Sequence, residues 1–268
     1  MVDSPYLVHP GKKVRLSDWP TDITGEFAKK ADAKPELHKN LKKLAEQQEL
    51  LYASGKRALL VVFQAMDGGG KDGAIEHVFS GVNPQGCVVT SFKVPTPEEM
   101  AHDFLWRIHK AAPARGMIGI FNRSHYESVL VERVKKLVPR EVWSARYDSI
   151  NSFERLLTDE GTTILKFFLH ISWEEQKRRM EARLKDPRKN WKFSPSDLKE
   201  RRRWDGYMEA YEDALRKCST KSAPWYIVPA DHKWYRNWVV SDTIVQALKK
   251  LKLSYPPPLK DADKIRVK

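Results

Sequence analysis

The chain has few of the features that mark secreted, membrane or zinc-binding proteins. Its two cysteines, Cys87 and Cys218, have neither CxxC spacing nor histidines at metal-binding intervals, so the sequence predicts neither a disulfide framework nor a structural zinc site. The longest mostly apolar run, Ala58–Met66, is too short to span a bilayer. The first residues show no apolar segment of a secretory signal. We therefore expect a cytoplasmic protein that does not enter a membrane.

Positive charge, by contrast, is in excess. The 268 residues include 48 Lys and Arg against 35 Asp and Glu, a net charge of +13. The length is sufficient for a large buried core, and a hydrophobic content of 41% argues against disorder. Such a charge indicates a polyanionic partner: nucleic acid, an anionic surface or a phosphate-rich substrate. Composition alone leaves these three open.

Short apolar runs alternate with helical patterns along the centre of the chain. A helix is expected from Glu36 to Gly55, another from Thr96 to Ile108, others after the capping residues Ser124 and Ser172, and a last one to about Leu251. The runs predicted as strands are Ala58–Gln64, Cys87–Phe92, Gly116–Phe121, Thr163–His170 and Trp225–Val228. Five buried strands separated by helices predict an α/β protein with a five-stranded parallel sheet. Residues 1–35 are expected to form an irregular arm, 36–251 the domain, and 252–268 an irregular tail.

A glycine-rich segment follows the first predicted strand and opens a helix. It matches the P-loop pattern at Gly70 and Lys71, with Ala65 in place of the first glycine and Asp72 in place of Ser or Thr. Its glycines let backbone N–H groups approach phosphate oxygens, and the helix N-terminus favours negative charge. The alternative is a glycine-rich turn with a solvated lysine. Strand, glycines, lysine and helix in this order favour phosphate binding.

Two carboxylates stand inside this predicted anion site. Asp67 and Asp72 would repel phosphates unless a cation intervened, and carboxylate oxygens are ligands that Mg²⁺ accepts. The sequence therefore predicts Mg²⁺ held by Asp67 and Asp72.

The third predicted strand ends in polar residues where nucleotide kinases usually carry a carboxylate. Asn122 is neutral here, and Arg123 is placed to neutralise charge on a transferring phosphoryl group, with Arg133 further along as a supporting cation. Glu127 has two interpretations, as a site residue or as the third residue of a Ser124 capping box. Arg123 could likewise be a surface residue at a helix start.

A basic segment precedes the last predicted strand. Between Lys177 and Lys221 there are 15 Lys or Arg and 8 Asp or Glu, so more than half of the excess charge lies there. In a P-loop kinase, an insert at this place is typical of a lid that supplies charge and excludes water. We expect a helical basic lid over about residues 186–217. The apolar stripe at Trp204, Met208, Tyr211 and Leu215 indicates packing more than binding.

Taken together, these stretches resemble the polyphosphate kinase type 2 family. The resemblance runs in order from about Leu50 to Leu251 and rests on MDGGGKDG, SFKVPTPEE, DFLWRIH, IFNRSHYES, VLVERV, RKNWKFSPSDLKERRRWD and APWYIVPADHKWYRNW. It implies a P-loop kinase-like three-layer sandwich that moves the terminal phosphoryl group of inorganic polyphosphate to a nucleotide with Mg²⁺. The family's phosphate loop likewise carries Asp at the position of Asp72. Its members are typically homotetramers or dimers of dimers.

The resemblance also implies the acceptor. Members that use ADP alone typically have Asp at the position of Asn122 and Asn at that of Glu127, so this chain resembles the subgroup (class III) that phosphorylates both AMP and ADP. Relatives commonly have Asp where this chain has Ser128. The nucleotide partners would be AMP, ADP and ATP, and no nucleic acid is expected as a partner.

Residue roles follow from the motifs and the resemblance together. We expect catalytic roles for Asp67, Lys71, Arg123 and Arg133. The residues expected to bind nucleotide or phosphate are Gly68, Gly69, Gly70, Lys71, Asp72, Gly73, Asn122 and Glu127. The residues expected to bind the polyphosphate chain along a track are Lys93, Arg107, Arg178, Arg188, Lys189 and Lys192. The nearest rival is an ATP-dependent nucleoside or nucleotide kinase, which shares fold and lid. A rival of another class is a nucleic-acid-binding protein, although no nucleic-acid-binding motif is visible.

Overall fold

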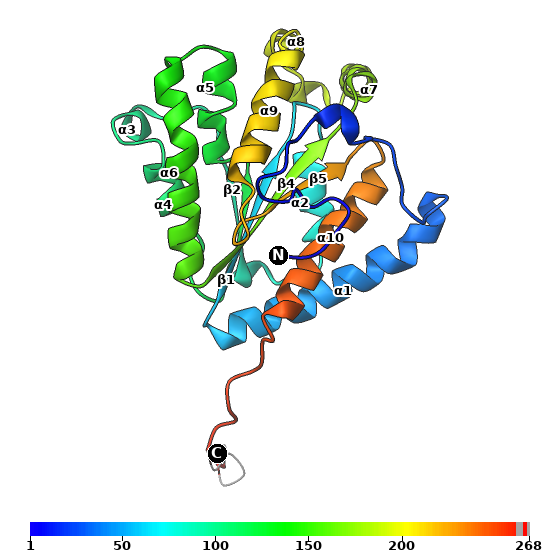
Figure 1. Cartoon of the computed structure of the whole chain (residues 1–268). Helices are drawn as coiled ribbons and strands as arrows, with labels where there is room; N and C mark the ends of the chain where they lie inside the picture. Colours follow the sequence, from blue (N-terminus) through cyan, green and yellow to red (C-terminus); the bar gives the residue numbers. More distant parts are fainter. Residues whose placement is uncertain (261–264, 267–268) are drawn as a thin grey trace.

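A parallel sheet forms the centre of the protein. The computed structural model describes residues 1–260 and 265–266. Five parallel strands lie in the order β2-β3-β1-β4-β5 (Figure 1). Their bounds are β1 Ala58–Gln64, β2 Cys87–Ser91, β3 Ile118–Asn122, β4 Thr162–His170 and β5 Trp225–Pro229. The predicted α/β class and five-stranded parallel sheet are confirmed. Because β1 lies between β3 and β4, the segments that leave β1 and β3 emerge side by side at one edge.

Helices cover both faces of the sheet, which gives three layers. All seven residues of β1 are buried, and successive side chains face opposite layers. Leu59, Val61 and Phe63 pack toward one face, Leu60 and Val62 toward the other. The first face is covered by α1 Lys30–Ser54, α2 Lys71–Val78 and α10 Lys233–Lys250, and the second by α4 Trp106–Lys110, α6 Arg140–Asp159 and α9 Trp204–Cys218.

Shorter elements complete the molecule. They are α3 Pro97–Met100, α5 Val131–Val134, α7 Trp173–Lys185 and α8 Pro195–Arg201, with 3-10 turns at Leu16–Asp18, Pro84–Gly86, His125–Ser128 and Asn190–Lys192. Within residues 1–260 and 265–266, no helix combines the length and hydrophobicity that a membrane span requires.

Two predicted helices have different bounds in the structure. The first begins at Lys30, not Glu36, because Asp32 accepts the N–H of Lys29 and starts the helix six residues earlier, with Pro35 inside it. The predicted helix from Thr96 to Ile108 is divided into α3 and α4. The Asp103 side chain accepts the N–H of Leu105 at 2.9 Å and starts a new turn, so a local side chain competes with helix continuation.

The N-terminal arm is largely irregular, as its composition suggests, but it is packed on the domain. Leu7 forms an antiparallel bridge with Tyr226, and backbone bonds join Val8 to Trp225 and Ile227 to Tyr6. The arm therefore covers the free edge of β5, where unpaired backbone groups would otherwise face solvent. Further along, the N–H of Leu16 donates to Glu212 on α9 at 2.7 Å.

The segment predicted as a lid has two parts of different character. Residues 186–203 form one 3-10 turn and α8, with exposed side chains such as Trp191. The second part is α9, whose Tyr207, Tyr211 and Leu215 are buried in the core. The lid expected over about residues 186–217 therefore includes most of a core helix, α9, because the apolar stripe of that helix packs against the sheet.

A buried ion pair that the apolar pattern of the strand did not indicate joins β4 to α6. Lys166 is fully buried, and its ammonium group donates to Glu154, to the Tyr126 hydroxyl at 2.9 Å and to the Cys218 carbonyl at 2.7 Å. Glu154 also binds the rings that follow β3, through the Tyr126 hydroxyl at 2.9 Å and His125 at 3.1 Å. The pair thus holds the 3-10 turn that follows Arg123 and Ser124.

We expect Glu154→Gln to destabilise the protein strongly, because it leaves the charge of Lys166 buried without a carboxylate. Breaking one side of a buried pair costs about 3–5 kcal/mol, whereas replacing both partners by apolar or neutral groups costs much less. Urea unfolding should show this loss for Glu154→Gln and a partial recovery for the double variant Glu154→Gln/Lys166→Met. A double variant less stable than Glu154→Gln would contradict the assignment.

Candidate functional site

The glycine loop between β1 and α2 is shaped by backbone conformations that glycine favours. Gly68 and Gly70 have φ of 82° and 94°, in the left-handed region. A Cβ on Gly69 would lie 2.5 Å from the Cβ of Ala65 and 2.8 Å from the carbonyl oxygen of Met66. The three consecutive glycines are therefore required for the path of the loop itself.

The carbonyl oxygens of this loop are bound by donors from other parts of the protein. The contacts are Lys71 to Ala65 at 2.8 Å, Gln176 to Asp67 at 2.7 Å, Arg179 to Gly68 at 3.0 Å and to Gly69 at 3.1 Å, and Arg236 to Gly70 at 3.0 Å. In a trans peptide the N–H points away from the carbonyl. The N–H groups of Gly68, Gly70 and Lys71 consequently face the opposite way and form an anion-binding concavity at the start of α2.

Gln176, Arg179 and Arg236 were not among the predicted site residues. All three are buried, on α7 and α10. The available signal was a polar residue on the inward face of each helix. In α7 the buried positions are Glu175, Gln176, Arg179 and Met180, a helical spacing at which apolar residues are usual.

Positive charge accumulates behind the loop. Burial, together with the neighbouring Arg179, lowers the pKa of Arg236 to about 9. Burial and the charge of Arg123 likewise lower the pKa of Lys71 to about 8, although Asp67, Glu127 and Asp72 act in the other direction. Burial and repulsion between neighbouring cations both disfavour these charges. A bound anion would offset both effects, so such a place favours anion binding.

Arg123 lies between two carboxylates beside this loop. Its guanidinium donates to Asp67 at 2.7 Å and to Glu127 at 3.2 Å, and its backbone is left-handed with φ of 64°. Burial works against its charge, but Glu127 and Asp67 outweigh burial and raise its pKa. The structure therefore brings Asp67, Arg123 and Glu127 together across 60 residues of sequence, and the Arg123 side chain is only partly exposed there.

The capping interpretation of Glu127 does not hold. The Ser124 hydroxyl accepts the N–H of Tyr126 at 3.2 Å, in a 3-10 turn and not an α-helix, and the Glu127 carboxylate binds Arg123. Ser128 closes the same turn by donating to the His125 carbonyl at 2.7 Å.

The second carboxylate of the loop meets the end of β3. The Asn122 amide donates to Asp72 at 2.8 Å. Among residues 1–260 and 265–266, no group of three or more His, Cys, Asp or Glu side chains could by itself enclose a metal ion. Mg²⁺ commonly takes one or two carboxylates and completes its shell with water and substrate phosphates. Asp67 and Asp72, both near enough to Lys71 to affect its pKa, fit that kind of site.

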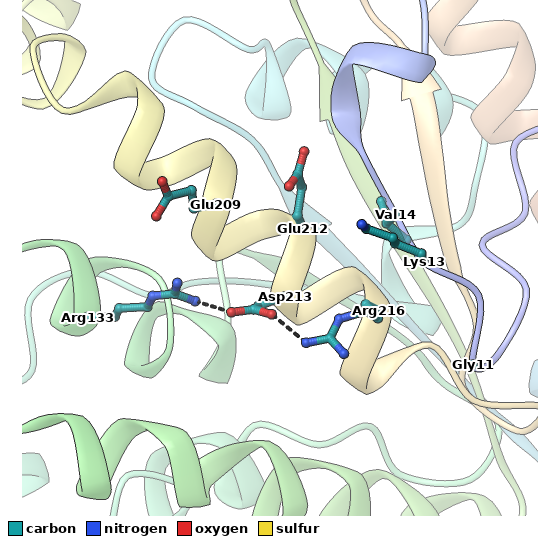
Figure 2. A pocket seen from close by; sticks show the side chains of 8 residues that line it. All are labelled: Gly11, Lys13, Val14, Arg133, Glu209, Glu212, Asp213 and Arg216. Carbon is teal, nitrogen blue, oxygen red and sulfur yellow. Dashed lines mark hydrogen bonds and ion pairs between the residues drawn. The ribbon is translucent and has the colours of Figure 1, made fainter.

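Arg133 lies in a different environment from Arg123. It donates to Asp213 at 2.8 Å (Figure 2). It also donates to the Tyr147 hydroxyl at 3.3 Å and lies over the Trp143 ring. It borders an open pocket of about 530 Å³ lined by Gly11, Lys13, Val14, Arg133, Glu209, Glu212, Asp213 and Arg216. Three cations and three carboxylates balance in this lining. Its partners are thus on α6 and α9, and a catalytic role for Arg133 stays a prediction.

The residues predicted for the polyphosphate track lie on separate segments. Arg107 of α4 donates to Glu99 at 3.2 Å and to the Lys93 carbonyl at 3.0 Å. Arg178 of α7 pairs with Glu175 and is largely exposed. In the lid, Arg188 and Lys189 pair with Asp186, and Lys192 lies over Trp191. Their common role stays a prediction.

Sheet order, glycine loop, Lys71 and the arginine at the end of β3 define a P-loop phosphotransferase. The family model for polyphosphate kinase 2 matches residues 27–255. The chain belongs to the polyphosphate kinase 2 family.

Relatives agree with this family along nearly the whole chain. An AMP/ADP-polyphosphate phosphotransferase of Meiothermus ruber is 54% identical, covering 97% of this chain and 98% of the relative. An ADP-polyphosphate phosphotransferase of Rhodopseudomonas palustris is 47% identical, covering 94% and 91%. The crystal structure of polyphosphate kinase 2 from Arthrobacter aurescens superposes with a TM-score of 0.92 at 45% identity, covering 96% of this chain and 93% of that one.

The lowered pKa of Lys71 generates a prediction for anion binding. The ammonium group of the free protein is charged below pH about 8 and loses its proton above it, so affinity for tripolyphosphate should fall as pH rises through that value. Arginine stays charged throughout. Titration calorimetry should therefore show the affinity of the wild type falling about tenfold relative to Lys71→Arg between pH about 7 and about 9. Parallel pH profiles for the two proteins would refute the assignment.

Proposed function

We propose that this protein transfers the terminal phosphoryl group of inorganic polyphosphate to AMP or ADP, giving ADP or ATP, with Mg²⁺. The observation that carries the proposal is Arg123, held by Asp67 and Glu127 beside the phosphate loop at the carboxyl ends of β1 and β3. The names of the relatives from Meiothermus ruber and Rhodopseudomonas palustris support the substrate class.

The residues of the site divide the work of phosphoryl transfer. The loop amides and Lys71 hold phosphate oxygens, and Arg123 neutralises charge that develops on the transferring group. Asp67 and Asp72 would hold Mg²⁺, which would neutralise negative charge on the phosphate groups. Since such transfer depends on in-line positioning more than on an elaborate base, the fixed geometry of Asp67 and Arg123 is the main contribution of the protein.

The cations on the lid and on α7 suit a donor that is itself a long polyanion. Lys93, Arg107, Arg178, Arg188, Lys189 and Lys192 are our candidates for its track, with the lid, residues 186–203, closing over it. We also propose a cytoplasmic location and a homo-oligomer, either a dimer or a tetramer, and the homo-oligomer rests on the family resemblance.

An assay with AMP, Mg²⁺ and polyphosphate but no ATP tests the donor. Formation of ADP supports the proposal, whereas ADP formed only when ATP is supplied would favour the rival nucleotide kinase. Nucleic-acid binding is tested in parallel: salt-sensitive duplex binding that polyphosphate fails to compete would favour that rival instead.

Lys71→Ala and Arg123→Ala should each lower kcat about 10³-fold or more, because each removes a charge that stabilises the transition state. Matched controls are Lys56→Ala and Arg115→Ala, exposed cations that precede β1 and β3 at the other edge of the sheet. Steady-state ADP formation should be near normal in both controls. Near-normal turnover in Lys71→Ala and Arg123→Ala would exclude the proposed roles.

Asn122 and Glu127 provide a prediction about the acceptor. Asn122→Asp places a carboxylate against Asp72, where the amide now donates at 2.8 Å, and Glu127→Asn frees one side of Arg123. Because members that use ADP alone typically carry these residues, the double variant should lose at least about tenfold in kcat/KM for AMP relative to ADP. Initial rates with each acceptor measure this ratio. An unchanged ratio would show that Asn122 and Glu127 do not determine the choice of acceptor.

A further inference from the structure

Gln176 stands between the phosphate loop and the lid. Its side chain is almost fully buried, with 1% of the residue exposed. The amide nitrogen donates to the Asp67 carbonyl at 2.7 Å, and the amide oxygen accepts from Arg201 at 2.6 Å. Since a carbonyl only accepts and a guanidinium only donates, these partners fix the orientation of the amide. One side chain therefore binds both elements at once.

Arg201 is the last residue of α8 and anchors that helix on α7. Its guanidinium lies 3.3 Å from the centroid of the Trp173 ring and donates to the Trp173 carbonyl at 2.8 Å. The Trp173 ring in turn packs edge-on against Trp204, the first residue of α9. The Arg201 guanidinium thus contacts both the Trp173 ring and the Gln176 amide at the end of the lid helix.

The rest of α8 is docked as well. Glu200 binds Lys135 at 2.9 Å and the Tyr207 hydroxyl at 2.6 Å, which joins the helix to α5 and α9. At the other end, burial and the charge of Asp67 raise the pKa of Asp197, so the beginning of α8 lies within electrostatic reach of the catalytic carboxylate. The lid helix is therefore held against α7 and α9 in this structure.

We propose that Gln176 is a positioning residue that couples the docking of the lid helix to the position of Asp67. When Arg201 leaves, the buried amide oxygen of Gln176 loses its donor, and an unsatisfied buried acceptor is unfavourable. Rotation of the amide toward another donor would release the Asp67 carbonyl. Lid docking and a fixed Asp67 therefore favour each other. The coupling rests on the proposed function, in which Asp67 holds Mg²⁺ beside Arg123.

Two variants separate the halves of this bridge. Gln176→Glu keeps an acceptor for Arg201 but removes the donor to Asp67, so the lid should stay docked while kcat falls about 10–100-fold, the scale of a misplacement near 1 Å. Arg201→Met removes the lid half, so hydrogen exchange should rise in residues 195–201 and also in the loop 65–70. Arg201→Lys can still donate to Gln176, so hydrogen exchange in both segments should stay close to that of the wild type.

The double variant tests the coupling. If both changes interrupt one path, Gln176→Glu/Arg201→Met should lose less than the product of the two single losses in kcat, whereas independent sites multiply. The control is Arg202→Met, which removes the same charge from an exposed neighbour of Arg201 and should leave loop exchange unchanged. Thermal unfolding shows that each variant is folded.

Three results would overturn the coupling: unchanged kcat in Gln176→Glu, unchanged lid exchange in Arg201→Met, or faster lid exchange in Arg201→Met with unchanged loop exchange. The exchange measurements need neither nucleotide nor polyphosphate. A wild type that fails to transfer phosphate from polyphosphate would therefore contradict the proposed function. The coupling between lid and loop could still be measured by hydrogen exchange.

Discussion

The binding of the loop carbonyls by Arg179 and Arg236 is the interaction on which the site depends. A loop that presents its N–H groups to phosphate must turn its carbonyl oxygens the other way, into the protein, where an unpaired oxygen is costly. Two buried guanidinium groups satisfy the oxygens of Gly68, Gly69 and Gly70. Because these donors are cations, the same contacts that fix the loop also place positive charge behind it. Shape and electrostatics of the site therefore have one origin.

The arginines at the loop differ in how their charge is balanced, and Arg179 pairs with Glu175 at 2.6 Å. Arg123 has two carboxylate partners, Asp67 and Glu127. Arg236, in contrast, binds the Gly70 carbonyl and the side chain of its neighbour Asn237, both neutral, although only 2% of the residue is exposed. An isolated buried charge is expensive unless a counter-charge is supplied. The phosphates of a bound substrate can supply it, so the binding energy of the anion and the stability of the loop are linked.

The sequence predicted what depends on local pattern. Short, mostly apolar runs identified all five strands, and the order of strand, glycines and lysine identified the loop, because these signals lie within a few residues of one another. Arg179, Arg236 and Gln176 could not be placed in the same way, since their loop partners are more than 100 residues distant. The Lys166–Glu154 pair was missed for a similar reason: a lysine inside an apolar strand gives no indication of its partner. The division between α3 and α4 was missed because one side chain, Asp103, outweighed a good helical pattern.

The excess positive charge takes on a different meaning in three dimensions. By count, the basic segment before β5 carries more than half of it, but within that segment Asp186 pairs with Arg188 and Lys189, and Asp213 with Arg133 and Arg216. Ion pairs between exposed side chains neutralise charge at little gain in stability. The cations that shape the site are instead the few buried ones at the loop, which contribute little to the total. Net charge thus indicates the kind of partner, whereas the burial of Lys71, Arg179 and Arg236 gathers positive charge at the glycine loop, where we propose that this partner binds.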